Sequence, residues 1–514
     1  DIDNKVISNE IEDIQDNLCK IYSKILGYDD IDIYDNFFEM GGDSILLTRM
    51  HGYIDNLYSD IVNVANLFEY TSIYTLSEFI HDELMKKTVG NEEKEETGIL
   101  SKYLDSQWTG ELSYAQKRMY VVYKRSKNKK IYNNPFAFKL DKMESKENAY
   151  HCIKTLMDRH DVLRTSFYFD GKSICQRVEE NIEPDISYYY QEDINDIDYD
   201  ELLTEFNLGK APLFKVSVIE LGNGGCVLFF DMHHIIIDGY SSSIINRELN
   251  DIITESPLAE ATYQYKHYIE YEKDFVQSTE YKKMEGYWDE RLKGYVRENY
   301  LQDFESQDKQ DQSGSFSLTL DQELINSLEK VAKTNNASLF AMFLMGINLV
   351  IHMFDSSEDV IVGVPCIGRV HEDVMNIVGM FTNTLPMRNY PVADKLLSDF
   401  IIEMKKNINN DLANQCYPYD RMVEKYRKTH KDGSSNLFNI MFDYESPNMD
   451  IVEGERKGSG DIILPVSFAK YDIDIQITNK NSSLVMKVDY SNEFSEEKVH
   501  DFIDKYLALL GHIT

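Results

Sequence analysis

The sequence has 514 residues and a formal net charge of −36 at pH 7. The length predicts two to four domains rather than one compact core, and the acidity argues against nucleic-acid binding. Six scattered cysteines without CxxC pairs predict reduced thiols in a cytoplasmic protein, with no metal site or disulfide framework. No apolar stretch is long enough to span a membrane. Because the chain starts without Met directly before a helical pattern, we expect it to be excised from a longer protein.

Residues 11–84 carry apolar side chains at helical spacing, which predicts a small helical bundle. The spacing is clearest at Ile14, Leu18, Ile21, Ile25, Leu76 and Ile80. Residues 86–98 are charged, punctuated by glycine and without periodicity, as is typical of a linker. These patterns predict a domain over residues 1–86 and a linker over residues 87–107.

Residues 35–47 combine an aromatic pair, a glycine pair and a serine before an apolar helical pattern. Ser44 stands at the start of the predicted helix. It either caps the helix and does nothing more, or presents its hydroxyl at the positive end of the helix dipole, where a phosphodiester is stabilised. The segment resembles the attachment site of peptidyl carrier proteins. The resemblance implies that Ser44 carries phosphopantetheine, a flexible arm that ends in a thiol.

A pair of histidines follows a strongly apolar run. Residues 226–230 predict a buried strand, and residues 241–249 predict a helix. His233 and His234 stand between them, where a strand ends beside an apolar wall. Such a pair either transfers protons, because histidine changes charge near neutral pH, or consists of core histidines bonded to backbone carbonyls.

The histidine segment resembles the HHxxxDG signature of nonribosomal peptide synthetase condensation domains. His233, His234, Asp238 and Gly239 fill its fixed positions. Further segments resemble the family's other motifs, in the family's order: residues 112–120, 159–167, 265–268, 378–388, 414–420 and 431–442. The sequence is therefore identified as a fragment of a nonribosomal peptide synthetase, a peptidyl carrier protein followed by a condensation domain.

The resemblance implies a multidomain fold. A small all-α carrier bundle precedes an α/β condensation domain made of two lobes like chloramphenicol acetyltransferase, with a tunnel between them. We expect the lobes over residues 108–275 and 276–514. Residues 214–219 and 360–364 predict strands, and residues 337–353 predict an apolar core helix.

The implied reaction is attack of an aminoacyl amine on a thioester to form an amide. An α-amino group has a pKa of about 8, so much of it is protonated at neutral pH. A tunnel raises the effective concentration of both substrates, and a histidine can accept or position the proton. By the family match, His234 takes this role, and His233 supports the loop. We expect Gly239 to allow a sharp turn or a close approach to substrate.

Asp238 follows three isoleucines, so we expect it to be buried. A buried carboxylate requires a cationic partner, and the candidates are Arg164, Arg369 and Arg388. The sequence leaves this choice open. Asn383, Arg388 and Arg164 either shape the substrate tunnel or support it structurally.

The order of the domains implies that Ser44 carries a donor aminoacyl or peptidyl thioester. A downstream carrier then brings the acceptor amine. The implied partners are the upstream adenylation domain, the downstream adenylation and carrier domains, and a phosphopantetheinyl transferase. Alternatives are an epimerisation domain, which exchanges the donor α-proton, and an ester-forming relative with an alcohol acceptor. A recruitment platform without activity is disfavoured, because it needs no HHxxxDG motif.

Overall fold

The structure is a computed structural model. It describes residues 2–26, 31–35, 37, 40, 44–58, 61–62, 66–67, 70–88, 98–106, 108–126, 128–140, 145–298, 300, 313–335, 337–430, 436–444, 460–461, 464, 469–480 and 483–513. The glycine pair and Asp43, the side chain of Ser44, residues 89–97 of the linker and residues 431–435 of the last motif lie outside the described residues.

The N-terminal helical bundle is confirmed. It contains α1 (Ile2–Leu26), α2 (Ser44–Leu57) and α4 (Ile73–Thr88). Apolar side chains at helical spacing, including Leu18, Ile54 and Ile80, form its buried core. The ring of Tyr22 packs edge-on against Phe37, with centroids 5.4 Å apart.

The first lobe is built on a five-stranded mixed sheet in the order β11-β1-β6-β5-β4. Its strands are β1 (Phe136–Leu140), β4 (Ile186–Gln191), β5 (Phe214–Leu221), β6 (Cys226–Met232) and β11 (Gly460–Asp461), and β2 (Thr165–Phe169) pairs separately with β3 (Ile174–Val178). Its helices are α5 (Tyr114–Arg125), α6 (Lys146–Arg159), α7 (Tyr199–Leu202), α8 (Gly239–Ile253) and α9 (Tyr265–Phe275), with short 3₁₀ turns at Ser101–Tyr103, Lys130–Tyr132, Asp161–Arg164 and Ile194–Asp196. Strand β6 is buried along its whole length, as its apolar run predicts.

The second lobe is built on a six-stranded mixed sheet in the order β7-β13-β12-β10-β8-β9. Its strands are β7 (Gly314–Thr319), β8 (Val360–Cys366), β9 (Asn383–Asn389), β10 (Ile440–Tyr444), β12 (Ile473–Lys480) and β13 (Ser483–Tyr490). Its helices are α10 (Thr279–Arg291), α11 (Gln322–Thr334), α12 (Leu339–Asp355), α13 (Glu372–Met375), α14 (Leu397–Ala413), α15 (Tyr419–Thr429) and α16 (Glu496–Ile513). The predicted apolar helix is α12, which lies in the core of this lobe.

Two segments from beyond residue 275 join the first lobe, so a division into two continuous stretches of chain is incomplete. Strand β11 pairs antiparallel with β1, which covers a sheet edge that would otherwise expose unpaired backbone groups. The segment that follows α13 buries Ile377, Val378 and Phe381 in the core of the first lobe. Apolar burial therefore ties the two lobes together near the histidine turn.

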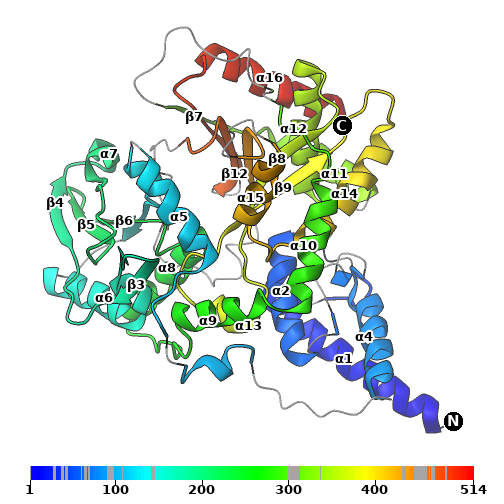
Figure 1. Cartoon of the computed structure of the whole chain (residues 1–514), viewed down its shortest axis with the longest axis horizontal. Helices are drawn as coiled ribbons and strands as arrows, with labels where there is room; N and C mark the ends of the chain where they lie inside the picture. Colours follow the sequence, from blue (N-terminus) through cyan, green and yellow to red (C-terminus); the bar gives the residue numbers. More distant parts are fainter. Residues whose placement is uncertain are drawn as a thin grey trace.

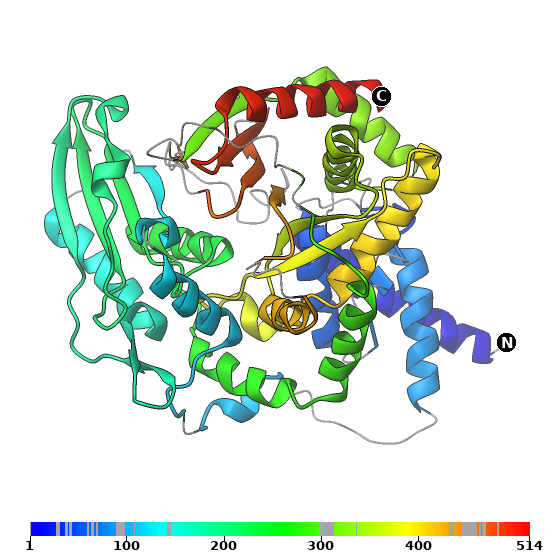
Figure 2. The same ribbon diagram turned by 45° about the horizontal axis from the view of Figure 1, so that its top comes forward.

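The lobes lie side by side, and the N-terminal bundle lies beneath the second lobe, with α2 toward α13 (Figure 1). Turning the molecule shows α16 across the top of the second lobe, with the sheet of the first lobe opposite (Figure 2). Among the described residues, no single helix has the length and apolarity to cross a membrane, although the bent pair α11 and α12 passes that test jointly.

We expect Glu272→Gln to stabilise the protein at pH 8 more than at pH 5. Glu272 accepts a hydrogen bond from the Tyr114 backbone N–H (2.9 Å), and burial raises its pKa from 4.5 to about 7. The folded protein keeps this proton between those values while the unfolded chain releases it, so stability falls as pH rises through the window. Glutamine keeps the hydrogen-bond acceptor and has no proton to release, so it avoids up to roughly 3 kcal/mol of the stability that the unsubstituted protein loses as pH rises.

Thermal unfolding at both pH values measures this difference. Glu270→Gln on the same helix is the matched control, because Glu270 forms an ion pair with Lys273 (2.8 Å). A gain in stability for Glu272→Gln that is equal at pH 5 and pH 8 contradicts the assignment.

Candidate active site

The two histidines lie in the turn between β6 and α8. The backbone N–H of His233 donates to the Leu213 carbonyl (2.9 Å), and that of His234 donates to the Tyr132 carbonyl (2.8 Å). The turn is therefore held by chain segments on both sides, which positions its side chains.

His234 lines a cavity of about 1620 Å³ between the two lobes. Its Nδ1 lies 2.7 Å from the Ile237 carbonyl oxygen. Because a carbonyl only accepts, Nδ1 carries the proton in the neutral ring and Nε2 keeps a free lone pair. Burial, followed by the charge of Lys470, lowers the pKa of His234 to about 4. The neutral base form therefore predominates at pH 7.

His233 is fully buried and makes different contacts from those of His234. Its Nδ1 accepts a hydrogen bond from the Ile235 backbone N–H (3.0 Å), and its ring packs edge-on against Tyr123, with centroids 4.7 Å apart. Burial lowers its pKa to about 3. These contacts shape the turn, as the packing interpretation of His233 expects.

Asp238 is fully buried and engaged on both carboxylate oxygens. Oδ1 accepts from the backbone N–H (2.8 Å) and hydroxyl (2.6 Å) of Ser241, at the start of α8. Oδ2 accepts from the Phe381 backbone N–H (2.9 Å). A carboxylate so occupied caps a helix and holds two segments together, and it is not placed to abstract a proton.

Arg369 is the cationic partner of Asp238. Its Nη2 lies 3.3 Å from Asp238 Oδ1, and its Nη1 donates to the carbonyls of Val374 (2.6 Å) and Ile377 (2.7 Å). The guanidinium also stacks on the Phe381 ring, 3.9 Å from its centroid. This fully buried pair joins the histidine turn of the first lobe to a segment from the second half of the chain.

Comparison with known proteins assigns the family. Residues 106–514 match the condensation domain family, and residues 16–80 match the phosphopantetheine attachment site. The chain belongs to the condensation domain family. Its N-terminal bundle is a carrier of the phosphopantetheine-binding kind.

The relatives are large peptide synthetases. The chain is 29% identical to gramicidin S synthase 2 of Aneurinibacillus migulanus over 98% of its own length and 11% of the relative. It is 30% identical to bacitracin synthase 3 of Bacillus licheniformis, over 97% of its length and 8% of the relative. The chain thus spans only a small part of these curated relatives.

Solved structures share the fold. A holo four-domain nonribosomal peptide synthetase bound to AMP and glycine superimposes with a TM-score of 0.67 at 20% identity, covering 78% of this chain and 32% of that one. The condensation domain of the monacolin K polyketide synthase MokA gives a TM-score of 0.68 at 15% identity, over 78% and 96% of the two chains.

The other candidate residues are not among those that line the cavity. Arg164 forms an ion pair with Asp161 (2.7 Å), and Arg388 forms one with Asp359 (2.6 Å). The amide of Asn383 donates to the carbonyls of Gln415 and Tyr417 (both 2.8 Å). These contacts favour the structural interpretation of all three residues.

Gly239 stands at the end of the histidine turn. It begins α8 without a positive φ, and a Cβ there would meet nothing within 4 Å. The turn therefore needs no left-handed backbone at this position. Gly239 does line the cavity, so close approach of a substrate remains compatible with its position.

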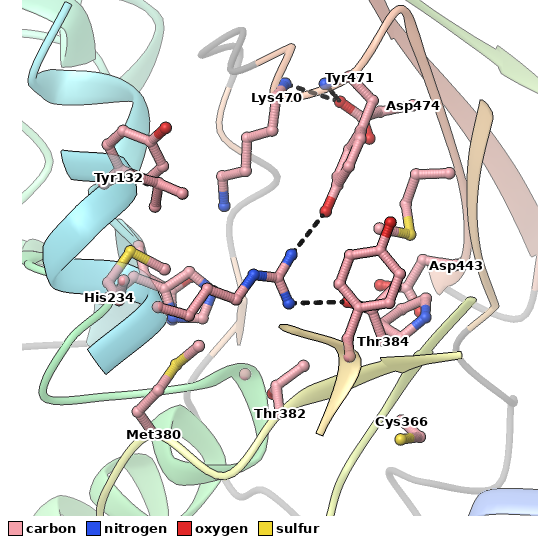
Figure 3. Close-up of a pocket in the computed structure, with 18 of the residues that line it drawn as sticks. Tyr132, His234, Cys366, Met380, Thr382, Thr384, Asp443, Lys470, Tyr471 and Asp474 are labelled. Atoms are coloured by element: carbon pink, nitrogen blue, oxygen red, sulfur yellow. Dashed lines mark hydrogen bonds between the residues drawn. The ribbon is translucent and has the colours of Figure 1, made fainter. Parts of the chain in front are cut away.

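The second lobe contributes polar cavity residues that the motifs do not identify. Figure 3 shows Lys470 extending into the cavity on the side of Tyr132 and His234. Tyr471 also lines the cavity, and its hydroxyl accepts a hydrogen bond from Arg118 of α5 in the first lobe (3.2 Å). Withdrawal from water raises the pKa of Asp474 to about 7. Its strand, β12, alternates buried isoleucines with polar residues, a sequence pattern that marks a strand with one polar face.

We expect Lys470→Met to raise the pKa of His234. Removal of a neighbouring positive charge favours the imidazolium form. Carbon-13 NMR of labelled histidines measures the titration. Lys487→Met is the control, because Lys487 lines the same cavity but forms an ion pair with Asp489 (3.3 Å). An unchanged His234 pKa in Lys470→Met contradicts the electrostatic effect of Lys470.

We expect Arg369→Met to destabilise the protein by about 3 kcal/mol or more, because it leaves the buried Asp238 carboxylate without its cation. Arg177→Met is the matched control. The Arg177–Glu179 pair is 2.6 Å long with an exposed arginine, and because water screens such pairs, their loss costs little stability. Thermal unfolding distinguishes the two, and equal losses contradict the role given to the buried pair.

Proposed function

We propose that this chain forms an amide between a donor acyl group carried on Ser44 and the amine of an acceptor. The observation that carries the proposal is His234, a neutral imidazole that lines a cavity between two lobes and keeps a free Nε2 lone pair. Such a group is suited to accept the proton of an attacking amine.

The carrier fits phosphopantetheine. Helix α2 begins at Ser44 and has no acidic residue in its first turn, so the positive end of its dipole can stabilise a phosphodiester. When bound, the arm supplies the thiol that holds the donor as a reactive thioester. The role of this chain's own residues is to position the donor and to move one proton.

The proposed chemistry needs no oxidant or further reactant. The acceptor nitrogen attacks the thioester carbonyl carbon, the C–N bond forms and the C–S bond breaks. Nε2 of His234 takes the proton from the nitrogen, and the thiolate leaves and regains a proton. Asp238 and Arg369 hold the turn that orients the imidazole, through the contacts described above.

The assembly-line context is part of the same proposal. The position of the carrier ahead of the condensation domain supports a donor role for Ser44, and the similarity to peptide synthetases supports a downstream carrier as the acceptor. Adenylation domains, a phosphopantetheinyl transferase and a cytoplasmic location belong to this context.

We expect His234→Ala to lower the rate of amide formation by about 10²-fold without abolishing it, because general-base help is lost while proximity in the tunnel remains. Ser44 is loaded with aminoacyl-pantetheine, an aminoacyl thioester acceptor is added in heavy water, and product is measured by mass spectrometry. His151→Ala is the control, since His151 is exposed on α6.

An unchanged rate for His234→Ala contradicts the general-base role. Deuterium at the donor α-carbon without amide product supports epimerisation instead. An ester formed with an alcohol acceptor, in place of an amide, supports the ester-forming alternative.

A further inference from the structure

The carrier helix α2 packs closely on the segment of the condensation domain that follows Arg369. A Cβ built at Gly52 would lie 3.1 Å from Met375 Cε, 3.3 Å from the Glu372 backbone nitrogen and 3.4 Å from the His371 carbonyl carbon. These are tighter than ordinary contacts. The absence of a side chain at position 52 therefore allows the helix to approach the backbone of α13.

His51 bridges the two domains beside this contact. Its Nδ1 lies 3.1 Å from the Val370 carbonyl oxygen of the condensation domain, and its Nε2 lies 2.9 Å from the Val62 carbonyl oxygen of the carrier. The side chain is buried, and burial lowers its pKa. The neutral ring carries one N–H, which donates to one of these carbonyls at a time.

A contact between a carboxylate and an imidazole lies one helical turn further along α2. Asp55 Oδ2 lies 3.2 Å from His371 Nδ1, and the two side chains are 19% and 23% exposed. His371 Nε2 lies 3.2 Å from the hydroxyl of Tyr271 on α9. The carrier carboxylate thus meets an imidazole that the first lobe already orients, which favours one docking geometry.

The other end of the contact points toward the cavity. Arg49 lies over the Tyr240 ring, 5.6 Å from its centroid, and Arg369 lies over the same ring at 4.8 Å. Tyr240 also lines the cavity that contains His234. Ser44 precedes Arg49 by five residues, about 7.5 Å of helix, so the first turn of α2 lies toward the cavity end of the interface.

We propose that Gly52, His51 and Asp55 of α2 form a recognition surface that selects this carrier, in cis, as the donor for its own condensation domain through Val370 and His371. The inference deepens the proposed function and rests on the donor role given there to Ser44. Gly52 gives shape selectivity, because a large side chain at that position would collide with Met375 and the backbone of residues 371–372. Asp55 gives charge selectivity, because a carrier without an acid there leaves His371 without its partner.

Hydrogen exchange of the unloaded full-length chain tests the docking without any catalysis. We expect faster exchange in residues 370–375 for His371→Asp, which places two carboxylates together, and for Asp55→His. The exchanged pair Asp55→His/His371→Asp restores one carboxylate opposite one imidazole and should return exchange to the original rate. Gly52→Leu should also accelerate exchange, although leucine favours the helix itself.

Donor transfer tests the selectivity. Each variant receives the donor either tethered on Ser44 or as a soluble aminoacyl N-acetylcysteamine thioester. We expect His371→Asp and Gly52→Leu to lower the tethered rate by roughly tenfold and to leave the soluble-donor rate unchanged. Asp13→Lys, an exposed charge change on α1, is the control and should alter neither rate.

The outcomes separate the two proposals. The recognition surface is overturned if the variants lose the same fraction of their rate with tethered and with soluble donors. It is also overturned if His371→Asp and Gly52→Leu both keep the transfer rate and the hydrogen exchange of the unsubstituted protein. If the unsubstituted protein forms no amide from either donor, the proposed function fails, and the exchange data alone then decide whether the surface docks the carrier.

Discussion

Asp238 and Arg369 lie 131 residues apart in the sequence and 3.3 Å apart in the structure, both without exposure to solvent. A buried carboxylate and a buried guanidinium are each costly alone, so the two segments that carry them are strongly held together. One segment is the histidine turn of the first lobe. The other leads from β8 into α13 and packs its apolar residues into the same lobe. The position of His234 depends on this buried ion pair.

The buried pair of Asp238 and Arg369 explains why His234, and not the neighbouring carboxylate, has an atom available for proton transfer. Both carboxylate oxygens of Asp238 accept hydrogen bonds, from Ser241, Arg369 and Phe381. His234 uses Nδ1 to donate to the carbonyl of Ile237, and burial and the charge of Lys470 disfavour its charged form. Burial and hydrogen bonding therefore make Asp238 a structural acid and His234 a neutral base within the same turn.

The carrier meets the condensation domain at the same segment. Val370 and His371 follow Arg369 directly, and they contact His51 and Asp55 of α2. The guanidinium groups of Arg49 and Arg369 both lie over the ring of Tyr240, which also lines the cavity. One short stretch of chain, residues 369–371, thus contacts both the histidine turn, through Arg369, and helix α2 of the carrier, through Val370 and His371.

The sequence by itself determined the local elements and the family. Periodicity predicted the helical bundle, β5, β6, β8 and α12, because residues a few positions apart decide which face of a helix or strand is apolar. The ordered motifs placed His234 at the end of a strand. The family resemblance, more than the spacing, led to the different roles expected for His234 and His233.

Tertiary structure decided which distant groups meet. Three arginines were equal candidates for Asp238 until the fold placed Asp161 beside Arg164 and Asp359 beside Arg388. The contact between His51 and Val370 spans 319 residues, and Lys470 enters the cavity from the second lobe. Local pattern carries no information about such pairs, because their proximity follows from how whole lobes pack, and packing depends on the shape and burial of many residues at once.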